Sequence, residues 1–400
     1  MTTTQQNSAD RKLLRYVIHS NTAFRSVENP FLLEFLHDLR PTYNPPGCYA
    51  LTHTLLDSEA ADVFLWETER LKSSNLLTLL EDGWEDRLKR SIYGLVVAGI
   101  DIFPIVMSLD DLTGERGGAD KCLEIAVKSL ELTGDSTGRK FIAMTTDNPT
   151  TMQSLCQKAQ MKSFWLLTFA CFLHSLNPPI GEICTYPLIK KIITKVNRTT
   201  TFFNGSHFWG GQLKDETKRL AITRGLKKNC ESRWYALVLL CLSVSSHQQP
   251  LSIICLRPDA QKKTNGFSAV AADVISTVLY TAEFWPLLNQ LTQITKPLVD
   301  AIGNCESRQA TLADCMLELI RFARTMSKMV LDDDEDEGFL VHAQATFDRR
   351  FKLTATPNHW LALFLHPFCQ KPRCLRHCAW ALPGFYDPDC ANNHSSVEVG

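Results

Sequence analysis

The sequence predicts an α/β protein in which a small mixed β-sheet is followed by a region built from helices. Three observations support this fold class. The segment Leu76–Met107 holds three apolar runs bounded by turn residues, a pattern typical of three consecutive strands. Residues 119–170 alternate helical and strand patterns, and from Tyr186 onward only helical periodicity remains. The predicted order is therefore β-β-β-α-β-α-β, followed by helices.

Composition narrows the class of protein. The chain has 400 residues, of which 44% are hydrophobic and 21% charged, as in ordinary globular proteins. Its net charge of −1 excludes an overall positive field that would attract nucleic acid, so any basic surface must be local. The 14 cysteines are irregularly spaced and follow no signal sequence, which argues against a disulfide framework. No run approaches the roughly 20 apolar residues of a membrane span, so we expect an intracellular protein without a membrane partner.

Residues 1–70 are expected to form an N-terminal helical segment. An apolar stripe over Phe31–Leu39, with Pro30 at its start, predicts one helix. A Pro- and Gly-rich stretch at 41–47 breaks the chain, and a second helix is expected from Ala50 to Leu71.

The sheet is expected to begin with an antiparallel meander. The first run, Leu76–Leu80, ends at Glu81-Asp82-Gly83-Trp84, so it carries an acid at its carboxyl end. The second and third strands are expected at Ile92–Ile100 and Ile102–Met107.

The later strands alternate with helices. Helical spacing over Ala119–Leu132 is followed by a fourth strand at Phe141–Thr146, which ends at Asp147. Such a strand–helix–strand passage usually joins parallel strands by a right-handed crossover. A helix at Thr151–Gln160 and a fifth strand at Phe164–Ala170 complete the predicted sheet.

The remaining chain shows helical periodicity without a repeat of fixed length. Helices are expected at Leu188–Phe203, Ser232–Val244, Ala269–Tyr280, Phe284–Ile302, Thr311–Met329, Phe339–Leu353 and His359–Leu365. The acidic run Asp332–Glu337 is expected to be a solvated loop, because it lacks the alternate spacing and central glycine of a calcium loop.

Asp82 and Asp147 are the first candidate site residues, because each ends a predicted strand. Two carboxylates at neighbouring strand ends can share Mg²⁺ or Mn²⁺ and so support phosphoryl chemistry. The alternative, which spacing alone favours, is that both aspartates merely form turns.

Two further pairs admit a functional and a structural interpretation. Cys171 and His174 could be half of a zinc site, or a packed cysteine beside a hydrogen-bonded histidine. Arg233 and Trp234 could hold a phosphate and stack an unpaired base, or simply begin a helix with the tryptophan packed inward.

Taken together, these pieces resemble the hAT superfamily of DNA transposases, in particular the domain of unknown function found in many plant and fungal members. The motifs occur in the family's order over about residues 24–367. They are Phe24–Phe31 with Leu39–Tyr43, Asp82-Gly83-Trp84, Thr146-Asp147-Asn148, Cys171–Asn177, Ser232-Arg233-Trp234 and Pro357–Pro367.

The resemblance implies a ribonuclease H-like core interrupted or followed by an all-helical insertion domain. It divides the chain into an N-terminal helical segment (1–70), a ribonuclease H-like core (71–204), an all-helical insertion domain (205–367) and an irregular Cys/His/Pro-rich tail (368–400).

The resemblance also implies cut-and-paste DNA transposition in the nucleus, with Mg²⁺ or Mn²⁺ held by two aspartates and one glutamate. Asp82 and Asp147 match the two aspartates. Cys171 and His174 match the pair near the active site.

Arg233 and Trp234 match the pair that handles a flipped base. Local basic surfaces at Lys190–Arg198 and Lys214–Lys228 would contribute to DNA binding.

Two departures from the family pattern bear on activity. After Pro367 the sequence lacks the family's glutamate motif and its dimerisation region, and the usual N-terminal BED zinc finger is missing too. We therefore expect a truncated, catalytically incomplete remnant that at most binds DNA. The alternatives are an active nuclease that uses a substitute acid such as Glu216, Glu231 or Glu306, and a host-recruited nuclear interaction protein.

Overall fold

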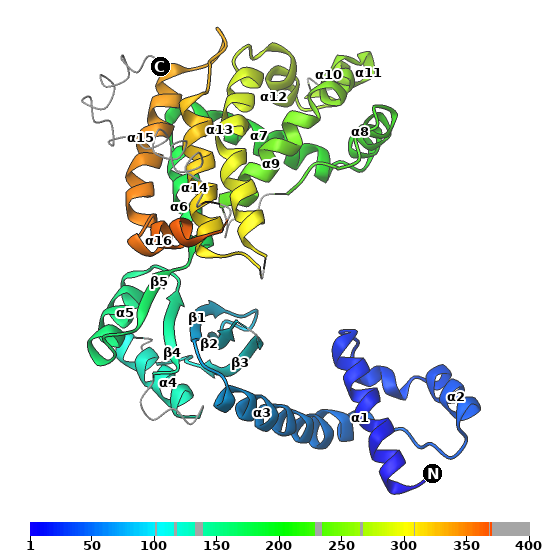
Figure 1. Ribbon diagram of the computed structural model, residues 1–400. Coiled ribbons are helices and arrows are strands. Elements are labelled where there is room, and N and C mark those ends of the chain that lie inside the picture. Colours follow the sequence, from blue (N-terminus) through cyan, green and yellow to red (C-terminus); the bar gives the residue numbers. More distant parts are fainter. Residues whose placement is uncertain are drawn as a thin grey trace, which may run out of the picture. The chain divides into compact units, whose positions relative to one another are not determined.

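The computed structural model describes residues 1–400 except 101, 116–117, 133–138, 229–233, 265–266, 308, 368 and 370–400. The chain divides into two compact units, residues 1–169 and residues 170–400. We call them the sheet unit and the helical unit, and each is described by itself (Figure 1).

The sheet unit is built around a five-stranded mixed sheet with the strand order β3-β2-β1-β4-β5. Its strands are β1 (Leu77–Glu85), β2 (Ser91–Gly99), β3 (Ile102–Asp111), β4 (Phe141–Thr146) and β5 (Leu167–Ala170). β2 pairs antiparallel with both β1 and β3, whereas β1 and β4 run parallel. The predicted α/β class and the order of its strands and helices are confirmed.

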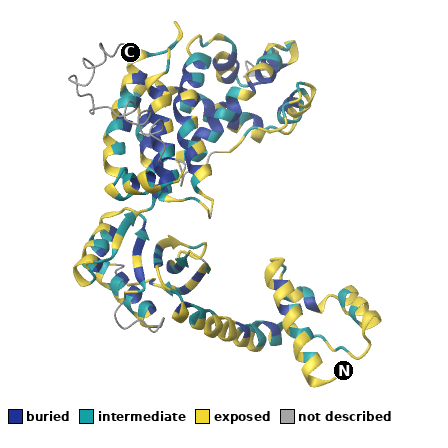
Figure 2. Cartoon of the chain, in the orientation of Figure 1, coloured by how far each residue is buried: buried dark blue, intermediate teal, exposed yellow. Residues whose placement is uncertain are grey.

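Helices α4 (Ala119–Leu132) and α5 (Thr150–Lys162) connect the later strands and share one core with the sheet. β1 alternates as a half-buried strand should, so Leu77 and Leu79 face this core. The next residue of the same row is Glu81, which is also buried. Figure 2 shows the contrast between buried and exposed residues in this unit, and along β1 the exposed stretch is the carboxyl end.

The N-terminal segment folds around a small cluster of its own, formed by Leu14, Val17, Val27 and Leu51. Its elements are α1 (Thr3–His19), η1 (Phe24–Glu28), α2 (Pro30–Leu39), η2 (Ala50–Leu55) and α3 (Leu56–Ser73). The helix predicted over residues 31–39 is confirmed. The start of α1 was not predicted, although Thr2 and Gln5 form a capping box that satisfies its first backbone N–H groups.

The helical unit has one large apolar core to which most of its helices contribute. The helices are α6 (Phe172–Ile183), α7 (Pro187–Gly205), α8 (His207–Arg219), α9 (Trp234–Ser246), α10 (Gln248–Leu256), α11 (Pro258–Gln261), α12 (Ala272–Ile275), η3 (Ser276–Tyr280), α13 (Phe284–Cys305), α14 (Leu312–Ser327), α15 (Glu337–Thr354) and α16 (Pro357–Leu365). Two short strands, β6 (Lys263–Thr264) and β7 (Phe267–Ser268), form a hairpin.

Polar contacts at the edge of this core connect helices that are distant in sequence. The carboxylate of Glu182 on α6 accepts hydrogen bonds from Arg349 and Arg350 on α15. Asp336, the last residue of the acidic loop, caps α15 and accepts a hydrogen bond from the Tyr186 hydroxyl at 2.9 Å. The acidic run was expected to be a loop, and Asp332–Asp336 is one.

Some details of the helical unit were not expected from the sequence. Helices α6 and α7, both within the predicted core of residues 71–204, lie in the compact unit of residues 170–400. Helices α8 and α10 were not predicted, because neither shows a strong apolar stripe. Within the described residues no single helix is long and apolar enough to cross a membrane, and only the bent pair α9–α10 has the combined length and composition.

Candidate functional site

Asp82 and Asp147 lie next to each other along neighbouring strands of the sheet. The parallel register of β1 and β4 pairs Glu81 with Thr146, and the two aspartates are the next residues of their strands. Residues in register on parallel strands occupy adjacent backbone positions, about 4.8 Å apart in the direction of the hydrogen bonds. Two carboxylates far apart in sequence are therefore brought to one end of the β1–β4 pair.

The two aspartates differ in local structure. Asp82 was expected to end its strand, but β1 continues to Glu85, because β2 still pairs with it there: Asp82 opposes Gly94. The interpretation of Asp82 as a turn residue is therefore wrong. Asp147 does follow the end of β4, where the chain turns into α5.

The environments of the two carboxyl groups also differ. Asp82 is exposed, and its Oδ1 accepts a hydrogen bond from the backbone N–H of Gly83 at 3.0 Å. Asp147 is half-buried. Burial raises the pKa of the Cys122 thiol on α4, and the charges of Glu81 and Asp147 raise it further. The charge of Asp147 is therefore close enough to act on the Cys122 thiol in the core.

A buried acid lies directly beside this pair. Glu81 is only 4% exposed, and neither of its carboxyl oxygens has a hydrogen-bond partner in the described part of the chain. The nearby Tyr93 hydroxyl donates to the sulfur of Met152 at 3.4 Å. Burial raises the pKa of Glu81 to about 8, and the neighbouring Tyr93 offsets this only in part.

Glu81 was not among the predicted site residues, although its sequence position carries a signal. Leu77, Leu79 and Glu81 occupy alternate positions of one predicted strand, so they must face the same side of the sheet. A glutamate in an inward row is the kind of perturbed group that often marks a functional site. At neutral pH it is mainly a neutral acid and so a poor metal ligand.

The aspartate pair fits a hard divalent cation. Mg²⁺ prefers oxygen ligands, keeps several waters and is commonly held by one or two carboxylates together with substrate phosphates. Asp82 is accessible, and Asp147 is adjacent to it at the strand end. Across the residues that the structure describes, no group of three or more His, Cys, Asp or Glu side chains is arranged to hold a metal.

Cys171 and His174 lie at the start of α6. Cys171 is the N-cap residue, and His174 is in the first helical turn. Burial acts to raise the pKa of the Cys171 thiol, but hydrogen bonds from the side chain and backbone of His174, together with its charge, lower that pKa overall. A cysteine at a helix N-terminus beside a histidine favours the thiolate.

Trp234 is the first residue of α9, and its ring lies against α6. A Cβ atom added to Gly181 would come within 2.6 Å of Trp234 Cε2, so only glycine leaves room for this ring. The backbone N–H of Tyr235 donates to Asn177 Oδ1 at 3.3 Å, which joins the same two helices. Trp234 remains 49% exposed, so it is neither buried nor free. Arg233 lies outside the described residues.

The basic surface predicted at Lys190–Arg198 is partly neutralised. Arg198 forms a two-point ion pair with Asp273, at 2.6 and 3.2 Å. Lys195 lies 3.4 Å from the Thr281 hydroxyl and 4.0 Å from Glu283. Fewer charges are therefore available to a polyanion here than the sequence suggests.

Of the three glutamates considered as a substitute third carboxylate, two have local structural roles and one lies outside the described residues. Glu216 is ion-paired with Arg219, and Glu306 is the C-cap residue of α13. Glu231 lies outside the described residues.

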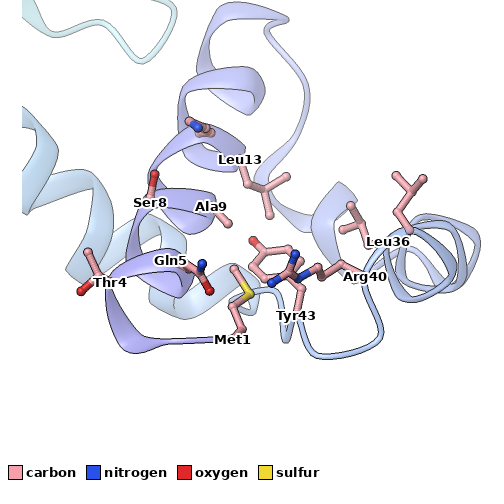
Figure 3. A pocket seen from close by; sticks show the side chains of 11 residues that line it. Met1, Thr4, Gln5, Ser8, Ala9, Leu13, Leu36, Arg40 and Tyr43 are labelled. Carbon is pink, nitrogen blue, oxygen red and sulfur yellow. The ribbon is translucent and has the colours of Figure 1, made fainter.

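A separate pocket of about 790 Å³ lies between α1 and α2. Tyr43 and Arg40 lie in this space beside Leu13 and Met1 (Figure 3). Burial and the nearby carboxylate of Asp10 hold the pKa of the Tyr43 hydroxyl well above its ordinary value. The pocket is mostly apolar and does not present groups suited to acid–base or metal chemistry.

No protein-family model and no curated protein matches the chain.

Proposed function

We propose that this chain is a DNA-binding protein of hAT-transposase descent, with a ribonuclease H-like core and an incomplete catalytic centre. One observation carries the proposal: β1 and β4 run parallel in register, and Asp82 and Asp147 directly follow their last paired residues. The resemblance assigns these same two aspartates to metal binding.

The topology supports the ribonuclease H-like part of the proposal. Three antiparallel strands come first, and the fourth strand then joins the other edge of β1 through α4, giving the order β3-β2-β1-β4-β5. This is the sequence of elements that the resemblance implies for the core. An all-helical region follows, apart from one short hairpin.

The packing of the helical motifs adds further support. Asn177 ends the motif that begins at Cys171, and Trp234 ends the Ser-Arg-Trp motif. The two motifs meet, because Asn177 bonds to the backbone beside Trp234 and Gly181 lies beneath its ring. A half-exposed tryptophan fixed from one side can stack an unpaired base on the other.

Asp82 and Asp147 are the residues that would hold a divalent cation. Such a cation would polarise a phosphoryl oxygen and lower the pKa of a bound water or a DNA 3′-hydroxyl. The contribution of the protein is to fix two carboxylates, an exposed one within β1 and a half-buried one directly after the end of β4. Gly83 orients Asp82 through its N–H.

Two carboxylates provide less charge and less positioning than the three that the family uses. Because phosphoryl transfer depends on placing metal and substrate together, the loss of one ligand costs more in rate than in binding. We therefore expect weak binding of Mn²⁺ at the aspartate pair, and DNA binding with little or no strand cleavage.

The test combines metal binding with cleavage. The purified chain is titrated with Mn²⁺ by calorimetry and incubated with nicked and hairpin DNA in Mn²⁺. Asp82→Asn and Asp147→Asn should each abolish Mn²⁺ binding, whereas Asp57→Asn, at an exposed aspartate of α3, should not change it. Equal Mn²⁺ binding by all three variants would refute the proposed metal site. Cleavage that both site variants remove would instead establish an active nuclease.

A further inference from the structure

A second cavity, of about 630 Å³, lies in the helical unit. It is formed by the end of α7, by α8 and by the segment 222–226 that follows α8. Its charged and titratable lining residues are His207, His247, Lys214, Lys218 and Arg224, so three permanent cations and two histidines meet there. None of the residues described as lining it is an aspartate or a glutamate.

These cations have no acidic partner that would explain their grouping. Lys214 and Lys218 are exposed, one helical turn apart on the same face of α8, and form no ion pair among the described residues. Like charges at this spacing destabilise a helix. The same helix carries two acids, Asp215 and Glu216, and neither lines the cavity. Glu216 is ion-paired with Arg219.

The backbone after α8 is held in the conformation that closes the cavity. Ala221 adopts the left-handed conformation with φ 56°, which is unusual for a residue other than glycine. Two hydrogen bonds fix this turn: the N–H of Ala221 donates to Lys218 O, and that of Ile222 donates to Thr217 O, both at 3.0 Å. The chain therefore reverses at once and brings Arg224 back towards the lysines.

The rest of the lining combines apolar side chains, such as Phe203 and Leu213, with neutral groups that can donate hydrogen bonds. The cavity is also lined by Thr223, Asn204 and the glycines Gly211 and Gly225, at which an added Cβ would meet no atom within 4 Å. Lysines act on a phosphate as point charges, and arginine offers a planar fork that can bind two of its oxygens.

We infer that this cavity is a binding site for a phosphate group, carried either by a nucleic-acid strand or by free phosphate. The grouping of cations without lining carboxylates favours an anion, and the open glycines leave room for it. The inference deepens the proposed DNA binding and rests on that part of the proposed function, because the three permanent cations of the cavity belong to the basic segment Lys214–Lys228 that was expected to contribute to it. Neither the aspartate pair nor a metal takes part, so failure of the metal site is distinguishable from failure of this one.

The test measures binding without divalent metal, so that failure of the aspartate site cannot affect it. Inorganic phosphate is titrated into the full chain by calorimetry in EDTA. In parallel, fluorescence anisotropy follows single-stranded DNA with and without a 5′-phosphate over a range of salt concentrations. The double variant Lys214→Gln/Lys218→Gln is compared with Lys328→Gln/Lys352→Gln, which removes the same charge from exposed positions outside the cavity.

The cavity variant should weaken binding about tenfold or more, and should lower the slope of log K against log salt by about 1.4 if both lysines contact a single strand. The control should stay within about twofold of the parent chain, if the loss depends on a specific site rather than on net charge. Loss of DNA binding identifies a nucleic-acid phosphate, and loss of phosphate binding alone identifies free phosphate.

Two results would overturn the inference. One is that the parent chain binds neither phosphate nor DNA in EDTA. The other is that the cavity variant and the control lose the same affinity. Thermal unfolding of both double variants shows whether the fold is retained. The single variant Lys218→Arg keeps the charge and should therefore bind as the parent chain does.

Discussion

Replacing Glu81 with glutamine should remove a pH dependence from the stability of the sheet unit. In the folded chain this carboxyl group is 4% exposed, and its oxygens have no hydrogen-bond partner in the described structure. Ionisation would place an unpaired charge against the core formed with α4 and α5, so the folded state keeps the proton.

The size and sign of the effect follow from the two pKa values. Burial raises the pKa of Glu81 from 4.5 to about 8 on folding. At about 1.4 kcal/mol for each pH unit, the difference corresponds to a cost on the order of 5 kcal/mol when the carboxyl is fully ionised. Because the folded state binds the proton more tightly, stability is highest below pH 4.5, falls as pH rises and levels off above about pH 8.

The assay must report on the sheet unit alone, since the chain has two compact units. Hydrogen exchange of peptides covering β1 and β2, corrected for intrinsic exchange, gives the local opening free energy across this pH range. Glu81→Gln has no proton to lose, so its opening free energy should be nearly independent of pH. Glu85→Gln, at the exposed end of the same strand, is the matched control and should keep the pH dependence of the parent chain.

The reasoning would be refuted by parallel profiles for the parent chain and Glu81→Gln between pH 5 and pH 9. An infrared carbonyl band that titrates near pH 8 in the parent chain and is missing in Glu81→Gln would identify the group directly. Glu81→Leu should be more stable than the parent above that pH, because it removes the buried charge altogether.

The remaining predictions concern the helical unit. Gly181→Ala should destabilise it by about 1–3 kcal/mol and change the fluorescence of Trp234, because the new methyl group overlaps the ring. Ala221→Gly should raise the stability by up to about 1 kcal/mol in denaturant unfolding, because it relieves the left-handed conformation. His174→Ala should slow alkylation of Cys171 by iodoacetamide and move its pH midpoint upward, because the histidine lowers the pKa of that thiol.

Matched controls separate these effects from general changes in stability. Gly303→Ala lies in the exposed part of α13, where an added Cβ meets nothing within 4 Å, so it should stabilise the helix by about 0.5–1 kcal/mol. If Gly181→Ala behaves the same way, the contact with Trp234 is not formed. Unchanged alkylation of Cys171 in His174→Ala would show that the two side chains do not interact in solution.

The sheet could be predicted from sequence because its signals are local. The apolar runs have the length of strands, and the ends predicted for β4 and α4 agree with the structure to the residue. The carboxyl end of β1 could not be predicted in the same way. Polar residues from Glu81 onward suggested a turn, but pairing with β2 keeps Asp82 and Gly83 extended. The end of β1 is determined by its pairing with β2, and the sequence of β1 alone does not predict that pairing.

Helix α8 and the start of α1 were not predicted although both have clear end signals, whereas α10, also not predicted, has no side-chain cap. Ser206 accepts a hydrogen bond from the N–H of Trp209, so it is the N-cap of α8. Thr2 and Gln5 do the same for α1 in a capping box. The capping residues predict the starts of both helices from sequence, because a cap acts within one turn and does not depend on which face of the helix is buried.

The candidate site shows why spacing alone favoured the wrong interpretation of Asp82. In a chain of this length, an Asp-Gly pair is far more often a turn than a ligand, and nothing local distinguishes the two. Pairing with β2 excludes the turn at Asp82. Once β1 and β4 are parallel partners, Glu81 and Thr146 must face the core together and the next residues must be neighbours. The same register that brings Asp82 and Asp147 to one place also buries an acid beside them. The pH profile of Glu81 therefore tests the register itself, because a shift of one residue would expose this glutamate and return its pKa to the ordinary range.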